Sequence, residues 1–152
     1  TRGMLVTILG RHFGIDASKF SAPRFSDVAA SQYYAPYVAG ASEKGIVNGI
    51  GGGRFDPDAT ITRQDAAALL LRYANFIGLD SATTAITFAD ASEIGGYATD
   101  GVGWAVKLGL VNGKPGNIFD PRGDMSRGET AAILHRFLLV LDDLDTTDDT
   151  DE

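Results

Sequence analysis

A hydroxyl residue followed at once by arginine, and then by a run of helix-forming residues, occurs three times in this 152-residue chain. The three copies begin at Thr1-Arg2, Thr62-Arg63 and Ser126-Arg127. The last two close a longer shared pattern, whose pieces recur 63 residues apart at its beginning and 64 residues apart afterwards. A period of this length indicates a supersecondary unit that buries its apolar face against its neighbours. We therefore expect an array of repeats.

Each complete repeat is expected to contain a helix, a glycine-rich loop and a second helix, so the predicted fold class is all-α. The expected helices cover residues 1–14, 35–44 and 63–77. Each one runs up to a glycine, a residue that commonly caps the carboxyl end of a helix. Pro36 is compatible with its helix only in the first turn, where no backbone N–H is needed. The connection over residues 45–57 is too rich in glycine to be regular.

The net charge of −7 is unevenly placed along the chain. Residues 142–152 hold seven of the 20 acidic residues and no Lys or Arg, which leaves 13 acidic residues against 13 basic ones elsewhere. A near-neutral body argues against nucleic-acid binding, and no apolar run is long enough for insertion into a membrane. The segment 142–152 is expected to be an acidic disordered tail or linker. The chain begins at Thr1 inside a repeat, so we expect a fragment or a processed product.

Five short motifs recur in the same order in the two complete repeats. They are Phe25-Ser26-Asp27 and Phe88-Ala89-Asp90, Gly40-Ala41 and Trp104-Ala105, Gly45–Gly49 and Gly109–Gly113, Phe55-Asp56-Pro57 and Phe119-Asp120-Pro121, and the helix starts at Thr62 and Ser126. This ordered set resembles the S-layer homology repeat. The resemblance covers residues 25–78 and 88–141 as complete repeats, with residues 1–14 as the last helix of a first repeat. It implies a pseudo-threefold module around a central helix bundle.

The resemblance also implies a non-catalytic module that anchors proteins to the bacterial cell wall, outside the cell. Its partner would be a secondary cell-wall polysaccharide, often pyruvylated, or a peptidoglycan-linked glycan, held in grooves between repeats. The alternative is an assembly module of a surface layer that self-associates through the incomplete first repeat. No metal is expected, because the chain lacks Cys for a thiolate site and the acidic turns at Asp56 and Asp120 lack the Gly and Glu of an EF-hand loop. No cofactor is expected, and the chain shows no convincing Ser-His-Asp set for catalysis.

The arginines of the repeated helix starts are the first candidates for ligand contact. Thr62 and Ser126 can cap their helices, with Asp65 and Glu129 three residues later as a capping box requires. An arginine directly after the cap is mildly unfavourable beside the positive end of the helix dipole, but it becomes favourable when an anion binds there. A pyruvyl carboxylate would suit such a site. The alternative is that Arg63 pairs with an acid such as Asp27 or Asp56.

The resemblance extends the candidate ligand-binding set to eight positions. They are Arg2, Arg63, Arg127, Asp27, Asp90, Gly49, Gly113 and Trp104. Trp104 would be a stacking platform for a sugar, although an interior position is equally compatible with the sequence. Arg63 and Arg127 have complete repeats around them, whereas Arg2 does not, so the first two are the favoured contacts.

Overall fold

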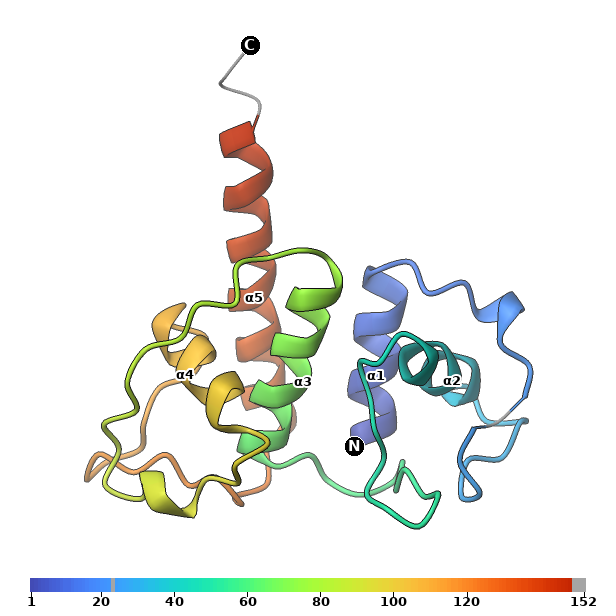
Figure 1. Ribbon diagram of the computed structural model, residues 1–152, viewed down its shortest axis with the longest axis horizontal. Helices are drawn as coiled ribbons and strands as arrows, with labels where there is room; N and C mark the ends of the chain where they lie inside the picture. The colour runs from blue at the N-terminus through green and yellow to red at the C-terminus, as the bar shows by residue number, and fades with distance from the viewer. Residues whose placement is uncertain (23, 149–152) are drawn as a thin grey trace. The chain divides into compact units, whose positions relative to one another are not determined.

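The computed structural model describes residues 1–22 and 24–148, and Figure 1 shows the order of their helices. The elements are α1 (Arg2–His12), η1 (Ala17–Lys19), α2 (Ala35–Glu43), α3 (Arg63–Phe76), η2 (Ala91–Glu93), α4 (Thr99–Lys107) and α5 (Arg127–Asp148). The described residues form no β-strand beyond isolated bridges, which confirms the all-α class. None of the described helices combines the length and the apolar character needed to cross a membrane.

The helix ends follow the local signals in the sequence. The three helices expected at residues 1–14, 35–44 and 63–77 all form, with ends within two residues of those ranges. Pro36 lies in the first turn of α2, where its missing N–H costs no hydrogen bond. Gly45 follows the end of α2 with φ +72°, a left-handed conformation that favours glycine.

The chain divides into two compact units, and the first contains Thr1–Ile61 together with Arg72–Asp80. In this unit α1 packs against α2, and α2 packs against η1 (Figure 1). Tyr73 is fully buried, and its hydroxyl donates a hydrogen bond to the carbonyl oxygen of Val6 at 3.3 Å. Its ring stacks on Phe13 with 5.4 Å between centroids. The last turns of α3 therefore complete the core beside α1.

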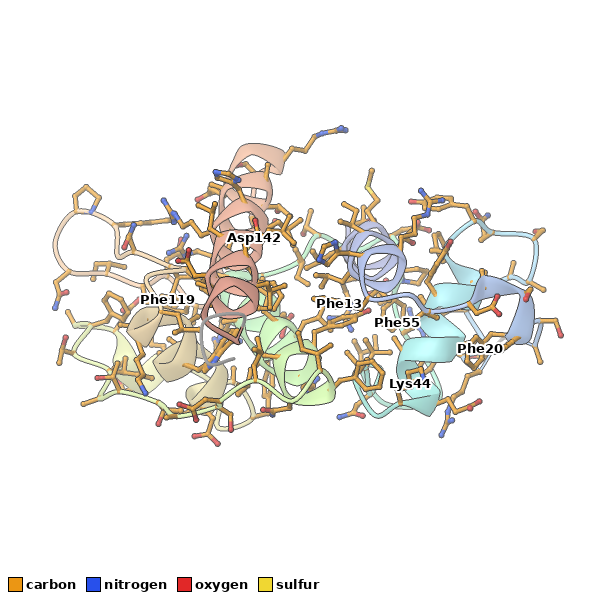
Figure 2. All side chains as sticks on the ribbon, turned by 90° about the horizontal axis from the view of Figure 1, so that it is seen from above. Phe13, Phe20, Lys44, Phe55, Phe119 and Asp142 are labelled. Carbon is orange, nitrogen blue, oxygen red and sulfur yellow. The ribbon has the colours of Figure 1, made fainter. Side chains whose placement is uncertain are left out.

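The second unit contains Thr62–Leu71 and the chain from Ser81 onward. Trp104 of α4 and Phe137 of α5 are both fully buried and meet edge to face, 5.8 Å apart. Gly101 lets α4 approach α3 closely, because a Cβ at this position would lie 2.7 Å from the Cα of Ala68. Figure 2 labels Phe119, another fully buried ring of this unit.

The boundaries of the two compact units differ from the boundaries of the sequence repeats. Residues Thr62–Leu71 belong to the complete repeat expected at 25–78, yet they cluster with the second unit. The helix start that ends one repeat is thus a structural part of the next.

One expectation needs correction at the carboxyl end. The sequence places a disordered tail at 142–152, but α5 continues through residues 142–148 to Asp148. No Gly or Pro interrupts the chain after Phe137, and each further residue of a formed helix adds one backbone hydrogen bond. Residues 149–152 lie outside the described part of the chain.

Candidate functional site: the helix starts and the Phe-Asp-Pro turns

A Phe-Asp-Pro turn follows the glycine-rich loop in each repeat. An aspartate from the start of the same repeat accepts hydrogen bonds from the backbone of this turn. In the second unit, the two carboxylate oxygens of Asp90 accept hydrogen bonds from the backbone N–H groups of Phe119 and Asp120, at 2.8 and 2.7 Å. Asp120 has φ +58°, which is uncommon for a residue with a side chain. The carboxylate of Asp90 thus stabilises a turn that the backbone alone would disfavour.

The first unit contains the same arrangement. Asp27 accepts hydrogen bonds from the backbone N–H groups of Phe55 and Asp56, both at 2.8 Å. Asp56 has the same φ of +58° as its counterpart in the second unit. Two of the candidate ligand contacts, Asp27 and Asp90, therefore use their carboxylates inside the protein to shape the turns.

These contacts change the acid strength of both aspartates. Desolvation raises the pKa of Asp90, but the N–H groups of Phe119 and Asp120 and the charge of Arg63 outweigh it, so the pKa lies below the ordinary 3.8. Desolvation likewise raises the pKa of Asp27. The hydrogen bonds from Phe55 and Asp56 and the charge of Arg54 have the larger combined effect, so the pKa of Asp27 is also lowered.

We expect the protein to lose stability in acid because of these carboxylates. A group with a lowered folded pKa stabilises the fold above its unfolded pKa, and this stabilisation is lost as the pH falls through the folded value. The free energy of unfolding should therefore be level from pH 7 to about 5 and decline below about pH 4. Urea unfolding followed by circular dichroism at pH 7, 5, 4 and 3 measures this. An unchanged free energy of unfolding between pH 5 and pH 3 would contradict the role of the two aspartates.

The two loop glycines, Gly49 and Gly113, lie where a Cβ atom would clash with neighbouring atoms, so a steric constraint explains glycine at both positions. A Cβ on Gly49 would lie 2.5 Å from the carbonyl oxygen of Arg54. A Cβ on Gly113 would lie 2.7 Å from a ring carbon of Phe88. Contacts this short do not occur, so both positions allow the loop to close against its own repeat.

Arg63, at the start of α3, is bound to the turn of the following repeat. Its Nε donates to the carbonyl oxygen of Phe119 at 2.6 Å, and its Nη2 donates to that of Asn112 at 2.8 Å. The guanidinium also lies over the Phe119 ring, 5.1 Å from the centroid. Arg63 is only 8% exposed, so these contacts are largely shielded from water. Its backbone N–H donates to the carbonyl oxygen of Gly123 at 3.0 Å.

The third nitrogen of the guanidinium faces an acid on α5. Nη1 of Arg63 lies 3.5 Å from Oε1 of Glu129, whose side chain is 41% exposed. Glu129 also completes a capping box, since its Oε2 accepts the backbone N–H of Ser126 at 2.8 Å. The sequence did not single out Glu129 as the partner of Arg63. The Nη1 contact is longer and more exposed than the other two, so it is the one that a ligand could replace.

Arg2 repeats the contacts of Arg63 in the first unit. Its Nε donates to the carbonyl oxygen of Phe55 at 3.0 Å, and its guanidinium lies 4.9 Å from the Phe55 ring centroid. The backbone N–H groups of Arg2 and Gly3 donate to the carbonyl oxygens of Ala59 and Pro57 at 3.0 and 2.9 Å. The structure thus gives Arg2 and Arg63 the same Nε, ring and backbone contacts with the Phe-Asp-Pro turn of their own unit.

Arg127 differs from both. Its side chain is exposed, and within residues 1–22 and 24–148 it makes no hydrogen bond or ion pair. The helix start itself is well formed, because Ser126 and Glu129 exchange both hydrogen bonds of the capping box. The surroundings of Arg127 therefore differ from those of Arg63, and the assignment of both arginines as ligand contacts stays a prediction.

Trp104 does not offer a platform for a sugar. It is 0% exposed and contacts Phe137, so the interior alternative is the one that the structure shows. The exposed aromatic residue near the start of α3 is Tyr97, which is 59% exposed and donates a hydrogen bond to Oδ1 of Asp65 at 2.6 Å. Sequence reasoning missed Tyr97. The available signal was the 64-residue spacing, which pairs it with Tyr33, a second exposed tyrosine.

Comparison with known families agrees with this repeated geometry. The sequence model of the S-layer homology domain matches residues 24–67 and 87–131, more than half of the chain. The chain belongs to the S-layer homology family. The matched segments contain both Phe-Asp-Pro turns, and the first also contains Arg63.

Three relatives show the settings in which this S-layer homology segment occurs. The chain is 34% identical to an amylopullulanase of Thermoanaerobacterium thermosulfurigenes over 91% of its own length and 7% of the enzyme. It is 34% identical to exoglucanase XynX of Acetivibrio thermocellus over 75% of its length and 11% of the enzyme. It is 26% identical to a cellulosome-anchoring protein of Acetivibrio thermocellus over 91% of its length and 32% of that protein. The chain therefore spans a third or less of each relative.

Proposed function

We propose that this S-layer homology chain is a non-catalytic module that attaches a larger protein to a bacterial cell wall, outside the cell, by binding a wall polysaccharide. The observation that carries the proposal is the range of proteins that share the segment. It forms 7% of an amylopullulanase, 11% of an exoglucanase and 32% of a cellulosome-anchoring protein. The names of these relatives share no single reaction, since two are names of enzymes and the third is that of an anchoring protein. A shared attachment module accounts for this distribution.

The chemistry of the second unit supports an anionic glycan as the ligand. The Nε and Nη2 of Arg63 are held by two carbonyl oxygens, so the guanidinium is preorganised with Nη1 directed at Glu129. A carboxylate on a sugar, such as a pyruvate ketal, would replace Glu129 as the partner of Nη1. Tyr97, exposed and joined to Asp65 two residues after Arg63, would provide the flat face for the sugar ring.

Wall binding can be tested by co-sedimentation with purified sacculi. Sacculi from an organism that carries a relative, such as Thermoanaerobacterium thermosulfurigenes, would be compared with the same sacculi stripped of secondary polysaccharide by hydrofluoric acid. The proposal expects the chain to sediment with the intact sacculi and to stay in solution with the stripped ones. Equal sedimentation with both preparations would show that the polysaccharide is not the ligand.

Glu129→Gln should tighten binding of the anionic polysaccharide. Glutamine can still accept the Ser126 N–H in a capping box, but it removes the negative charge that competes for Nη1 of Arg63. Because exposed ion pairs contribute below about 1 kcal/mol, the gain in affinity should be about three-fold. A titration of sacculi with the variant measures this.

Glu43→Gln is the matched control, because it makes the same charge change on an exposed position of α2. It should leave the affinity unchanged. Equal or weaker binding by Glu129→Gln would exclude the Arg63 site, while sedimentation of the parent chain would still support wall attachment.

A further inference from the structure

Two asparagines of this chain are followed directly by glycine, and they hold the same place in the two repeats. Asn48-Gly49 and Asn112-Gly113 both follow a valine at the start of the glycine-rich loop, and both asparagines are exposed. Within residues 1–22 and 24–148, neither glycine donates its backbone N–H to a hydrogen bond. Each pair therefore has an accessible side-chain amide beside a backbone nitrogen that no other group binds.

An asparagine followed by glycine can lose its side-chain amide without an enzyme. The backbone nitrogen of the glycine attacks Cγ of the asparagine and gives its proton to the side-chain nitrogen, which leaves as ammonia. The product is a five-membered imide, which water then opens. Attack of water at Cγ gives aspartate, and attack at the backbone carbonyl carbon gives isoaspartate, in which the main chain runs through Cγ. Glycine favours ring closure because it has no side chain to obstruct it.

Arg63 restrains only one of the two pairs. Its Nη2 donates to the backbone carbonyl oxygen of Asn112 at 2.8 Å. Ring closure reorients the peptide group to which this carbonyl belongs, so the bond to the guanidinium must break first. Arg2, the counterpart of Arg63, donates through Nε to Phe55, and Asn48 takes part in no hydrogen bond within the described residues.

The loop that follows Asn48 also has the weaker restraint. Gly51 and Gly52 both have left-handed backbone conformations, and a Cβ on either would meet no atom within 4 Å. In the second repeat, the side-chain amide of Asn117 ties the corresponding loop to the carbonyl oxygen of Thr87 at 2.7 Å. The first loop can therefore rearrange at a lower cost than the second.

We propose that Asn48 is a modification site, at which the side-chain amide is lost and the link to Gly49 becomes aspartyl or isoaspartyl. Arg63 protects Asn112, the matching residue of the second repeat, from the same reaction. Water is the only co-reactant. This assignment goes beyond wall attachment and does not depend on any glycan.

The modification changes the loop at a closely packed point. An isoaspartate adds one carbon atom to the main chain directly before Gly49. A Cβ on this glycine would already lie 2.5 Å from the carbonyl oxygen of Arg54 and 2.7 Å from a ring carbon of Phe25. Both products also replace a neutral amide by a carboxylate. The reaction therefore acts on the loop that leads into the first Phe-Asp-Pro turn.

The two sites can be compared within one sample, because the local sequence Val-Asn-Gly is the same at both. The parent chain is kept in warm, mildly alkaline buffer below its melting temperature, and the same chain in urea is the unfolded reference. Trypsin then releases residues 45–54, which contain Asn48, and residues 108–122, which contain Asn112. Mass spectrometry measures the conversion of amide to carboxyl, and a methyltransferase specific for isoaspartate labels that product.

In urea the two asparagines should react at the same rate. In the folded chain Asn112 should react about ten-fold more slowly than Asn48, because a hydrogen bond from a charged donor must be broken. Equal folded rates would overturn the proposal, as would an Asn48 that stays intact in the folded chain while the urea sample reacts. Asn117, which is followed by isoleucine, is the internal control. Its reaction at the rate of Asn48 would show that the glycine is not needed.

Arg63→Lys tests whether the guanidinium provides the protection. Lysine keeps a charged donor for the carbonyl oxygen of Phe119, but its single nitrogen cannot also hold that of Asn112. The rate at Asn112 should rise about ten-fold. Arg127→Lys is the matched control and should leave this rate unchanged. A rate at Asn112 that does not respond to Arg63→Lys would overturn the protecting role of Arg63, and the comparison in the parent chain stands whether or not this variant folds.

Discussion

Replacing Arg63 by alanine should lower the free energy of unfolding by about 3 kcal/mol. The substitution leaves the carbonyl oxygens of Phe119 and Asn112 without their donors and removes the guanidinium from the Phe119 ring. Each unsatisfied buried acceptor costs about 1–3 kcal/mol, and the lost ring contact adds to this. Thermal unfolding followed by circular dichroism should show a fall of about 10 °C.

Arg127→Ala is the matched control for this experiment, since it removes the same residue from the same motif. Because Arg127 is exposed and makes no hydrogen bond within the described residues, its loss should change the free energy of unfolding by less than about 0.5 kcal/mol. If the two variants had equal melting temperatures, the contacts of Arg63 with the turn would contribute nothing to stability. The difference between two arginines of one motif is therefore a direct measure of what the bound turn contributes.

Replacing Asp90 by asparagine should lower the free energy of unfolding by about 2 kcal/mol at pH 7. Both carboxylate oxygens accept backbone N–H groups, those of Phe119 and Asp120. An asparagine amide offers only one oxygen and would turn its own NH2 group toward the second N–H. The variant should also lose part of the decline in stability below pH 4, since one of the responsible carboxylates is gone. Urea unfolding at pH 7 and pH 3 measures both effects.

Asp58→Asn provides the comparison with an exposed aspartate and the same change of charge. Its free energy of unfolding should remain within about 0.5 kcal/mol of the parent protein, and its pH dependence should be unchanged. A stable Asp90→Asn protein with the acid sensitivity of the parent would show that the turn does not depend on this carboxylate.

Arg63 contributes to stability and is also a proposed ligand contact, so the two roles must be tested by different substitutions. Arg63 contributes to the fold through Nε and Nη2 and can meet a ligand only through Nη1, which faces Glu129. An alanine at this position would combine a loss of stability with a loss of binding. Glu129→Gln separates the two effects, because it changes the partner of Nη1 and leaves the bonds to the turn in place.

Local chemistry along the chain determined the repeat, the all-α class and the helix ends. Gly45 and Gly78 end helices because glycine readily adopts the left-handed backbone conformation found there. Thr62 and Ser126 begin helices because their side chains accept backbone N–H groups. Such signals act within a few residues and can be read from any single repeat. The family resemblance followed from the order and spacing of these same motifs, and the family match confirms it.

Only the tertiary structure decided which residues of the motifs are available to a ligand. Arg63 and Arg127 have the same local sequence pattern, but Arg63 is buried on the turn of the next repeat while Arg127 is exposed. Trp104, equally open to both interpretations in the sequence, proved to be interior because α5 places Phe137 against it. Burial depends on what packs against a residue from distant parts of the chain. That information lies in long-range contacts such as the one between Arg63 and Phe119, and not in the motif that surrounds each residue.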